Sequence, residues 1–566
     1  MKLPSINRDT IGADLSAGLV LGIQSIPDGM AAGLLALINP IYGLYSYMTG
    51  VFFGAFFTSS AFMSIQATSA MALIVASVPQ VTQSPDPNSA LFALAILTGV
   101  VMLAAGLLKL GTLVRFVPNS VMTGFVNAVA ILIVLGQLDD FTGYSTTGPN
   151  RVVRTFDLLL NLDQVHLPTL IVGLLTIILI VTLEKTSLKA MGLVVAIIFA
   201  SLVVPLFGAD QVAQVRDIAQ IPGSLPRPML PPLSVLPGLI IPALSLAFVG
   251  LVQGASITQS VPNPDGKYPD ASRDFIGQGA ANLFAGLLQG MPVGGSMSAT
   301  ALVRSAGARS RLANVIAGVT MALAILLFGR LVGLLAMPAL AGLLIVVGFR
   351  TLKLDQVMMV WKTGLVQQVV MGITFVAALF VPLQFAVLIG VGMAVLLFVF
   401  QQSNKITVVA WQIEPGRYPV ESAAPAVVPA QRVTVLVPYG SLFYAAAPVF
   451  AEQLPEVTAE SRHAVVIIVL RGRSEIGSTF VTVLQRYAET LRAHGSKLML
   501  VGVDAAVLNQ LASTGLLYTI GEANVFPATS QLGEALNSAV AAANAWLGQP
   551  PASAEIDAGQ APPEVS

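Results

Sequence analysis

The chain has 566 residues and no net charge; 55% of its residues are hydrophobic and only 10% are charged. Soluble domains carry about 25% charged residues, so this composition is typical of an integral membrane protein. Zero net charge gives no bulk attraction to nucleic acid, and the lack of cysteine excludes disulfides and thiolate metal sites. The histidines are scattered and no Walker loop is present, so we expect no metal, cofactor or nucleic-acid partner.

Apolar runs long enough to cross a hydrocarbon core of about 30 Å recur between residues 11 and 402. The sequence predicts about fourteen membrane segments there. Clear examples are the runs at 90–108, 167–183, 190–207 and 385–400. The polar N-terminus has no early apolar region, so no cleavable signal peptide is expected.

The distribution of Lys and Arg between the loops predicts the orientation. With fourteen segments and a cytoplasmic N-terminus, the internal loops carry most of these residues, including Lys109, Arg309 and Lys362. The positive-inside rule therefore favours both termini in the cytoplasm and the cell (inner) membrane as the location.

Two stretches far apart share an unusual start. "QATSAMALIV" (66–75) and "GSMSATALVR" (295–304) both read Ser-Ala-x-Ala-Leu when Ser69 is aligned with Ser298. A helix that begins inside the membrane presents unpaired N–H groups and a partial positive charge, which suit an anion. Paired broken segments in the two halves of a transporter indicate its binding site. The alternative is that the small residues only permit close helix packing.

Hydroxyl side chains at these two helix starts would add hydrogen-bond donors to such a site. The candidate anion-binding residues of this kind are Thr68, Ser69, Ser296, Ser298 and Thr300. Together with the backbone N–H groups they would bind an anion without a charged side chain.

Asp28 is an ionisable residue within the first membrane segment, directly after Pro27, and Gln24 lies one helical turn earlier. Ionisable residues inside a membrane are functional candidates by default. We expect Gln24 and Asp28 to belong to the site, with Asp28 binding the coupling ion, a proton or sodium. The alternative is that Asp28 only accepts backbone hydrogen bonds at the proline break.

The remainder of the chain has a different pattern. We predict a transmembrane domain at 1–403, a flexible Pro/Ala-rich linker at 404–431, a small cytoplasmic domain at 432–547 and a disordered tail at 548–566. Strand-like runs at 432–445, 463–472 and 497–503 alternate with helical stretches, which predicts an α/β layer domain. Gly495 is placed as a helix C-cap, and Ser478 as an N-cap or, alternatively, a phosphorylation site.

The chain resembles the sulfate permease (SulP) family of anion transporters. The resemblance is carried by the segments 26–46 ("IPDGMAAGLLALINPIYGLYS"), 108–125 ("LKLGTLVRFVPNSVMTGF") and 273–302. The C-terminal domain is similar to a STAS domain, through "GSLFYAAAPVFAEQL" (440–454) and "GLLYTIGEANVFP" (515–527). The resemblance implies seven plus seven inverted repeats that form a core and a gate, an elevator-like movement, and a homodimer in membrane lipid.

The resemblance also implies that the first, third, eighth and tenth segments form the anion site, which adds Gln253 and Ala299. Gln253 stands where many members carry a carboxylate implicated in coupling, and Ala299 where the usual motif has an arginine. With that arginine replaced, the name of the family does not make sulfate the expected substrate. We predict a small inorganic anion or a carboxylate.

Three classes of function are compatible with these features. The leading prediction is a secondary active transporter of a small anion, coupled through Asp28. The second is an anion-sensing membrane protein that signals through its STAS-like domain. An enzyme is the weakest, since no nucleophile–base pair or metal cluster is evident.

Overall fold

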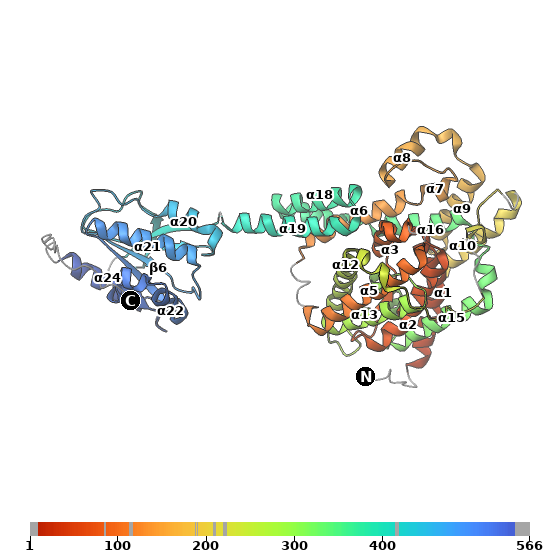
Figure 1. Cartoon of the computed structure of the whole chain (residues 1–566), viewed down its shortest axis with the longest axis horizontal. Helices are drawn as coiled ribbons and strands as arrows, with labels where there is room; N and C mark the ends of the chain where they lie inside the picture. Colours follow the sequence, from red (N-terminus) through yellow and green to blue (C-terminus); the bar gives the residue numbers. More distant parts are fainter. Residues whose placement is uncertain are drawn as a thin grey trace. The chain divides into compact units, whose positions relative to one another are not determined.

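The computed structural model describes residues 10–83, 86–111, 117–186, 188, 191–207, 211–218, 223–403, 405–413 and 418–548. The chain divides into two compact units, Met1–Ala394 and Val395–Ser566. In its described part the first unit is almost entirely helical, and the second contains a six-stranded sheet. Each unit is described separately below (Figure 1).

Apolar helices dominate the first unit, and seven helices in the described part of the chain are long and apolar enough to cross a membrane. The segments that match the predicted spans follow one another in chain order. They are α1 (Ile11–Leu35), α2 (Pro40–Phe57), β1 (Ser64–Gln66) with α3 (Ser69–Ala76), α5 (Pro87–Leu107), α6 (Asn119–Leu135), α9 (Leu167–Leu183), α10 (Met191–Val203), α12 (Ile240–Ser260), α13 (Ala271–Leu287), β2 (Gly294–Ser296) with α14 (Met297–Ser305), α15 (Leu312–Val332), α16 (Met337–Thr351), α18 (Leu365–Phe380) and α19 (Leu383–Ser403).

Short helices connect these segments. They are α4 (Pro79–Thr82), α7 (Leu138–Thr142), α8 (Arg151–Leu160), η2 (Leu162–Gln164), η3 (Val204–Phe207), α11 (Val215–Ile218), η4 (Leu233–Val235), η5 (Pro237–Leu239) and α17 (Leu354–Thr363). Two of them, α8 and α17, occupy corresponding places: α8 precedes α9 in the first half of the unit, and α17 precedes α18 in the second half.

The helices pack as two groups, and each group contains helices from both halves of the unit. In one group, α13 packs against α5 and α2, while α1 packs against α15 and α2. In the other group, α6 and α16 contact each other, α6 contacts α18, and α16 contacts α9 (Figure 1). This matches the predicted core and gate.

Glycines allow the core helices to approach closely. A Cβ on Gly43 of α2 would lie 2.1 Å from the carbonyl oxygen of Gly29 on α1 and 2.7 Å from the backbone nitrogen of Gly33. Because the obstructing atoms are backbone, the contact between α1 and α2 requires glycine at position 43.

The second unit contains a sheet in the order β4-β3-β5-β6-β7-β8. Its strands are β3 (Thr407–Gln412), β4 (Val420–Ala423), β5 (Val433–Tyr439), β6 (Val465–Val469), β7 (Lys497–Val503) and β8 (Val525–Pro527). Strands β5 to β8 are parallel and β3 is antiparallel to both of its neighbours. The three predicted strand runs are therefore β5, β6 and β7.

Helices cover both faces of this sheet, and two separate apolar clusters form against it. The helices are η6 (Tyr444–Ala446), α20 (Ala447–Gln453), α21 (Ser478–Ala493), α22 (Ala505–Ser513), α23 (Leu516–Ile520), η7 (Glu522–Asn524) and α24 (Glu534–Leu547). Gly495 has φ 67 just after α21, as predicted for a helix end. The prediction of Ser478 as the N-cap is wrong: Gly477 occupies that position and Ser478 is the first helical residue.

The predicted flexible linker, 404–431, contains two strands of this sheet. Val409 and Trp411 of β3 pair with Val437 and Val435 of β5, and β4 in turn pairs with β3. The apolar run of β3 is short and stands beside Pro- and Ala-rich sequence, which is why the pattern resembled a linker. The sheet therefore begins at residue 407, and not at 432, where the domain was predicted to start. The predicted tail, 548–566, lies outside the described residues beyond Gly548.

Candidate anion site between two broken segments

The structure brings the two broken segments together. Strands β1 and β2 pair in antiparallel register, with Ser64 opposite Ser296 and Gln66 opposite Gly294. Each strand leads directly into a short helix, β1 into α3 and β2 into α14. The N-termini of both half-helices therefore lie at one small ribbon, where their unpaired N–H groups and partial positive charges favour an anion.

Hydroxyl side chains cap both half-helices. The Thr68 hydroxyl accepts from the Met71 N–H of α3 at 3.4 Å and donates to Gln253 Oε1 of α12 at 3.0 Å. Ser296 Oγ accepts from the Ala299 N–H of α14 at 3.3 Å and lies 3.3 Å from Ser298 Oγ. Thr68, Gln253, Ser296 and Ser298 thus gather around the two helix starts.

The other predicted donors differ in what they can offer. Thr300 is fully buried; its hydroxyl donates to the Ser296 carbonyl at 2.6 Å and accepts from the Ser64 N–H at 3.1 Å. Both of its hydrogen-bonding roles are therefore used inside the protein. Ser69 is the half-buried first residue of α3, and Ser298 is exposed. Ala299 is buried and contributes its N–H to the cap.

Gln24 and Asp28 lie on the face of α1 that contacts the ribbon. Ser25, between them in sequence, accepts a hydrogen bond from Gln66 Nε2 of β1 at 2.7 Å. At 100° per residue, Gln24, Ser25 and Asp28 fall within one 100° sector of the helix. Gln24 Oε1 is buried without a hydrogen-bond partner, as expected for a group that serves a ligand or water.

Asp28 differs from the two fully buried carboxylates of this unit. Asp14 accepts from the backbone N–H groups of Arg309 and Ser310 at 2.6 and 2.9 Å. Asp274 accepts from the N–H groups of Ser59 and Ser60 at 2.6 and 3.1 Å. Half-buried Asp28 accepts no hydrogen bond and forms no ion pair with any described residue, and α1 is continuous through Pro27. The backbone hydrogen bonds that the alternative role of Asp28 requires are therefore not present among the described residues.

Two asparagines that the sequence reading did not single out hold the ribbon in place. Asn282 of α13 accepts from the Val293 N–H at 2.8 Å and donates to the Val293 carbonyl at 2.6 Å. Asn314 of α15 donates to the Met63 carbonyl at 3.1 Å and accepts from Ser64 Oγ at 2.7 Å. These side chains supply hydrogen bonds that the backbone beside the ribbon would otherwise lack inside the membrane. The signal in the sequence was an amide side chain within a predicted membrane segment.

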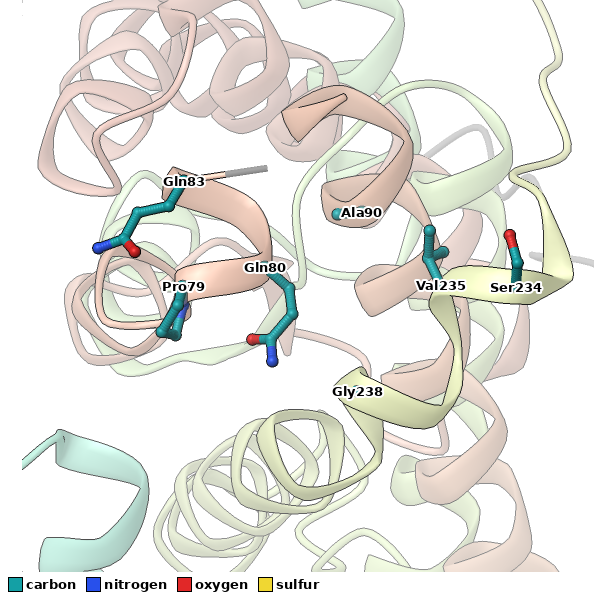
Figure 2. Close-up of a pocket in the computed structure, with 7 residues that line it drawn as sticks. All are labelled: Pro79, Gln80, Gln83, Ala90, Ser234, Val235 and Gly238. Atoms are coloured by element: carbon teal, nitrogen blue, oxygen red, sulfur yellow. The ribbon is translucent and has the colours of Figure 1, made fainter. Parts of the chain in front are cut away.

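The structure also has an open pocket, which is separate from the two half-helix starts. A cavity of about 460 Å³ lies between the α4–α5 corner and the segment that leads into α12 (Figure 2). Its lining residues are Pro79, Gln80, Gln83, Ala90, Ser234, Val235 and Gly238. None of the predicted site residues lines it, so this pocket is not the candidate anion site.

Comparison with known proteins agrees with this architecture. The profile of the Sulfate permease family matches residues 11–374, and that of the STAS domain matches residues 424–532. The chain is 24% identical to "Probable sulfate transporter 4.2" of Arabidopsis thaliana, over 90% of this chain and 78% of that protein.

Solved structures share the fold. The murine Solute Carrier 26 family member A9 anion transporter superposes with a TM-score of 0.82 at 21% identity, covering 95% of this chain and 92% of that chain. The transmembrane domain of the cyanobacterial bicarbonate transporter BicA superposes with a TM-score of 0.57 at 21% identity, covering 70% of this chain and all of that domain. The chain therefore belongs to the sulfate permease family: it is a multi-pass membrane anion transporter with a C-terminal STAS domain, not an enzyme.

Proposed function

We propose that this protein is a secondary active transporter that holds a small anion between the N-termini of α3 and α14. The observation that carries the proposal is the antiparallel pairing of β1 with β2, which places two capped helix starts at one ribbon. The donors are backbone N–H groups and hydroxyls. Such donors bind an anion without the cost of burying a fixed positive charge.

Movement of the core against the gate would carry this site across the membrane. The ribbon, α1, α3, α12 and α14 belong to the core group, whereas α6, α9, α16 and α18 form the other group. Because the site lies entirely on core elements, a rigid movement of the core exposes it to each side in turn. This is an elevator-type mechanism.

Asp28 supplies the coupling in this proposal. Its carboxylate shares a helix face with Gln24 and Ser25, next to the ribbon, and has no described hydrogen-bond partner. A proton bound there would offset the charge of an incoming anion in a site with little water. A proton is the preferred coupling ion, and sodium is the alternative.

Ala299 and Gln253 set the expected substrate class. Neither position provides a charged side chain, so the anion is held by dipoles and hydroxyls alone. Such a site suits a small monovalent inorganic anion or a carboxylate better than a divalent one. We further propose a homodimer in the cell membrane with both termini cytoplasmic, as the distribution of Lys and Arg indicates.

Replacing the exposed hydroxyl at the start of α14 should weaken anion binding. Hydrogen bonds to charged groups contribute about 1.5–3 kcal/mol, so Ser298→Ala should raise the KM for uptake by about tenfold or more. Ser305→Ala is the matched control: it removes a hydroxyl from the opposite end of the same helix, where Ser305 Oγ donates to Leu302 O. Equal KM values for the two variants would contradict the assigned site.

Uptake measurements in proteoliposomes test the function directly. Labelled chloride, bicarbonate, sulfate and dicarboxylates would be supplied with and without an inward proton or sodium gradient. The proposal predicts concentrative uptake of at least one monovalent anion, stimulated by one of the gradients. Binding of anions without any uptake would instead indicate an anion sensor that signals through the STAS domain.

A further inference from the structure

Helix α17 carries an apolar stripe that no described part of the first unit covers. Leu354, Met358 and Trp361 recur at the spacing of one helix face and are 68%, 54% and 58% exposed. Met359 beside them is 53% exposed, and Leu365, which begins α18, is 73% exposed. The buried side of the helix is marked by Val360. An ordinary surface helix turns its apolar stripe inward, so α17 has the opposite arrangement.

The two ends of α17 are fixed to membrane helices. At its start, the Lys353 N–H donates to Oδ1 of the buried Asn127 of α6 at 2.9 Å. At its end, Gln368 Nε2 of α18 donates to the Trp361 carbonyl at 2.6 Å. Between α17 and α18 the chain turns sharply at Gly364, where φ is 147 and a side chain would be strained. The outward orientation of the stripe is therefore set by the fold.

The stripe continues into an exposed apolar face of α18. On α18, Val369, Val376 and Phe380 are exposed on the same side as Leu365. This face belongs to a helix that crosses the membrane, so its natural environment is acyl chains. The α17 stripe thus extends the exposed apolar face of α18 across the break at Gly364.

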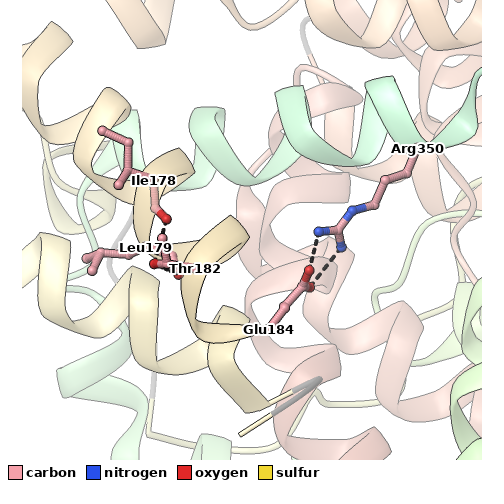
Figure 3. Close-up of polar contacts among 5 residues, drawn as sticks. All are labelled: Ile178, Leu179, Thr182, Glu184 and Arg350. Carbon is pink, nitrogen blue, oxygen red and sulfur yellow. Dashed lines mark hydrogen bonds and ion pairs between the residues drawn. The ribbon is translucent and has the colours of Figure 1, made fainter. Parts of the chain in front are cut away.

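The charges beside the stripe suit lipid phosphates. Arg350, at the end of α16, is already engaged in a bidentate ion pair with Glu184 of α9 (Figure 3), with one contact of 2.9 Å. Lys353 and Lys362 are exposed and form no ion pair with a described residue, while Asp355 offsets one of them. Long lysine side chains reach from an apolar surface to the headgroup layer.

We propose that α17 lies in the boundary of the adjacent phospholipid leaflet, with Leu354, Met358, Trp361 and Leu365 among the upper acyl chains and Lys353 and Lys362 at the phosphates. The partner is the lipid surface itself. Exposed Trp beside Lys is the composition that this boundary favours. An α17 that lies in the leaflet anchors the group of α6, α16 and α18 to the membrane. The consequence of this anchoring for transport rests on the proposed elevator movement.

The corresponding helix of the first half supports the same interpretation. On α8, Val153, Phe156 and Leu160 are exposed at the spacing of one face. Since the two halves have inverted orientations, α8 and α17 belong to opposite leaflets. Each half of the protein thus has one interfacial helix.

Tryptophan fluorescence tests the proposal on the full-length protein. The chain has three Trp residues, and Trp411→Phe with Trp546→Phe leaves Trp361 as the only tryptophan, which excitation at long wavelength separates from tyrosine. In proteoliposomes, phosphatidylcholine brominated near the headgroup should quench Trp361 more than lipid brominated near the chain end, and aqueous acrylamide should quench it weakly. If the double variant does not fold, the wild type is compared with Trp361→Phe. The fluorescence that this variant lacks is that of Trp361, and its quenching is measured.

A residue on the opposite face of the helix provides the matched control. Met358→Glu places a charge on the stripe and should lower lipid quenching while raising acrylamide quenching. Gln356→Glu, at an exposed position about 160° around the helix from Met358, should change neither. Quenching by acrylamide alone would overturn the proposal, as would quenching by neither agent, which would indicate that a second copy of the chain covers the stripe. The readout requires no transport, so it stands or falls separately from the proposed function.

Discussion

Uptake by the Asp28→Asn variant is expected to lose its dependence on an inward proton gradient. Asparagine resembles the protonated carboxyl in shape and charge but cannot bind or release a proton. Because Asp28 has no described hydrogen-bond partner to lose, the variant should fold and still bind the anion. Uptake with a gradient should therefore fall to the rate measured without one. Initial rates in proteoliposomes at several internal and external pH values measure this.

Two companion variants sharpen this test. Asp28→Glu keeps a titratable carboxyl and should retain part of the gradient stimulation. Asp163→Asn removes an exposed carboxylate in η2, far along the chain from the site elements, and should leave coupling intact. Full gradient stimulation in Asp28→Asn would show that Asp28 is not the coupling residue.

Asn282→Leu is expected to have the largest effect on the integrity of the site. The substitution leaves both the N–H and the carbonyl of Val293 without their partners at 2.8 and 2.6 Å. An unsatisfied buried polar group costs about 1–3 kcal/mol, and proteins are stable by only about 5–15 kcal/mol. The variant should show a markedly lower melting temperature in detergent and little or no uptake.

The role of Asn282 in positioning the ribbon can be separated from a general loss of stability. Asn282→Asp keeps the acceptor for the Val293 N–H, but an ionised carboxyl cannot donate to the Val293 carbonyl and adds a buried negative charge beside the ribbon. A raised KM for the anion is the expected result. Asn127→Leu removes another buried asparagine, whose Oδ1 accepts from Lys353 N–H outside the ribbon. It should lower the melting temperature without changing KM. An unchanged KM in Asn282→Asp would contradict a positioning role.

The membrane segments and the two broken helices could be predicted because their signals are local. Long apolar runs identify the spans, and the repeated Ser-Ala-x-Ala-Leu pattern marks the starts of α3 and α14. The pairing of β1 with β2 could not be predicted from local sequence. Its strands are three residues long, contain glycine and serine, and lie far apart in the chain.

The residues that hold the ribbon and the two additional strands could be identified only from the folded structure, for the same reason. Asn314 and Ser64 are separated by 250 positions, and nothing near either residue identifies the other as its partner. Strand β4 is mostly exposed and is recognisable only through its pairing with β3. Helix α17 is short, and its stripe became informative only once its exposure was known.

Protection of a single cysteine at the start of α14 tests the central claim most directly. The natural chain has no cysteine, so Ser298→Cys introduces the one reactive thiol at an exposed position beside the Ser296 cap. Its rate of modification by a charged thiol reagent would be measured in proteoliposomes with each anion present. The account predicts that transported anions slow the modification in proportion to their occupancy, whereas anions that are not transported leave it unchanged. A modification rate that no transported anion alters would contradict an anion site between α3 and α14.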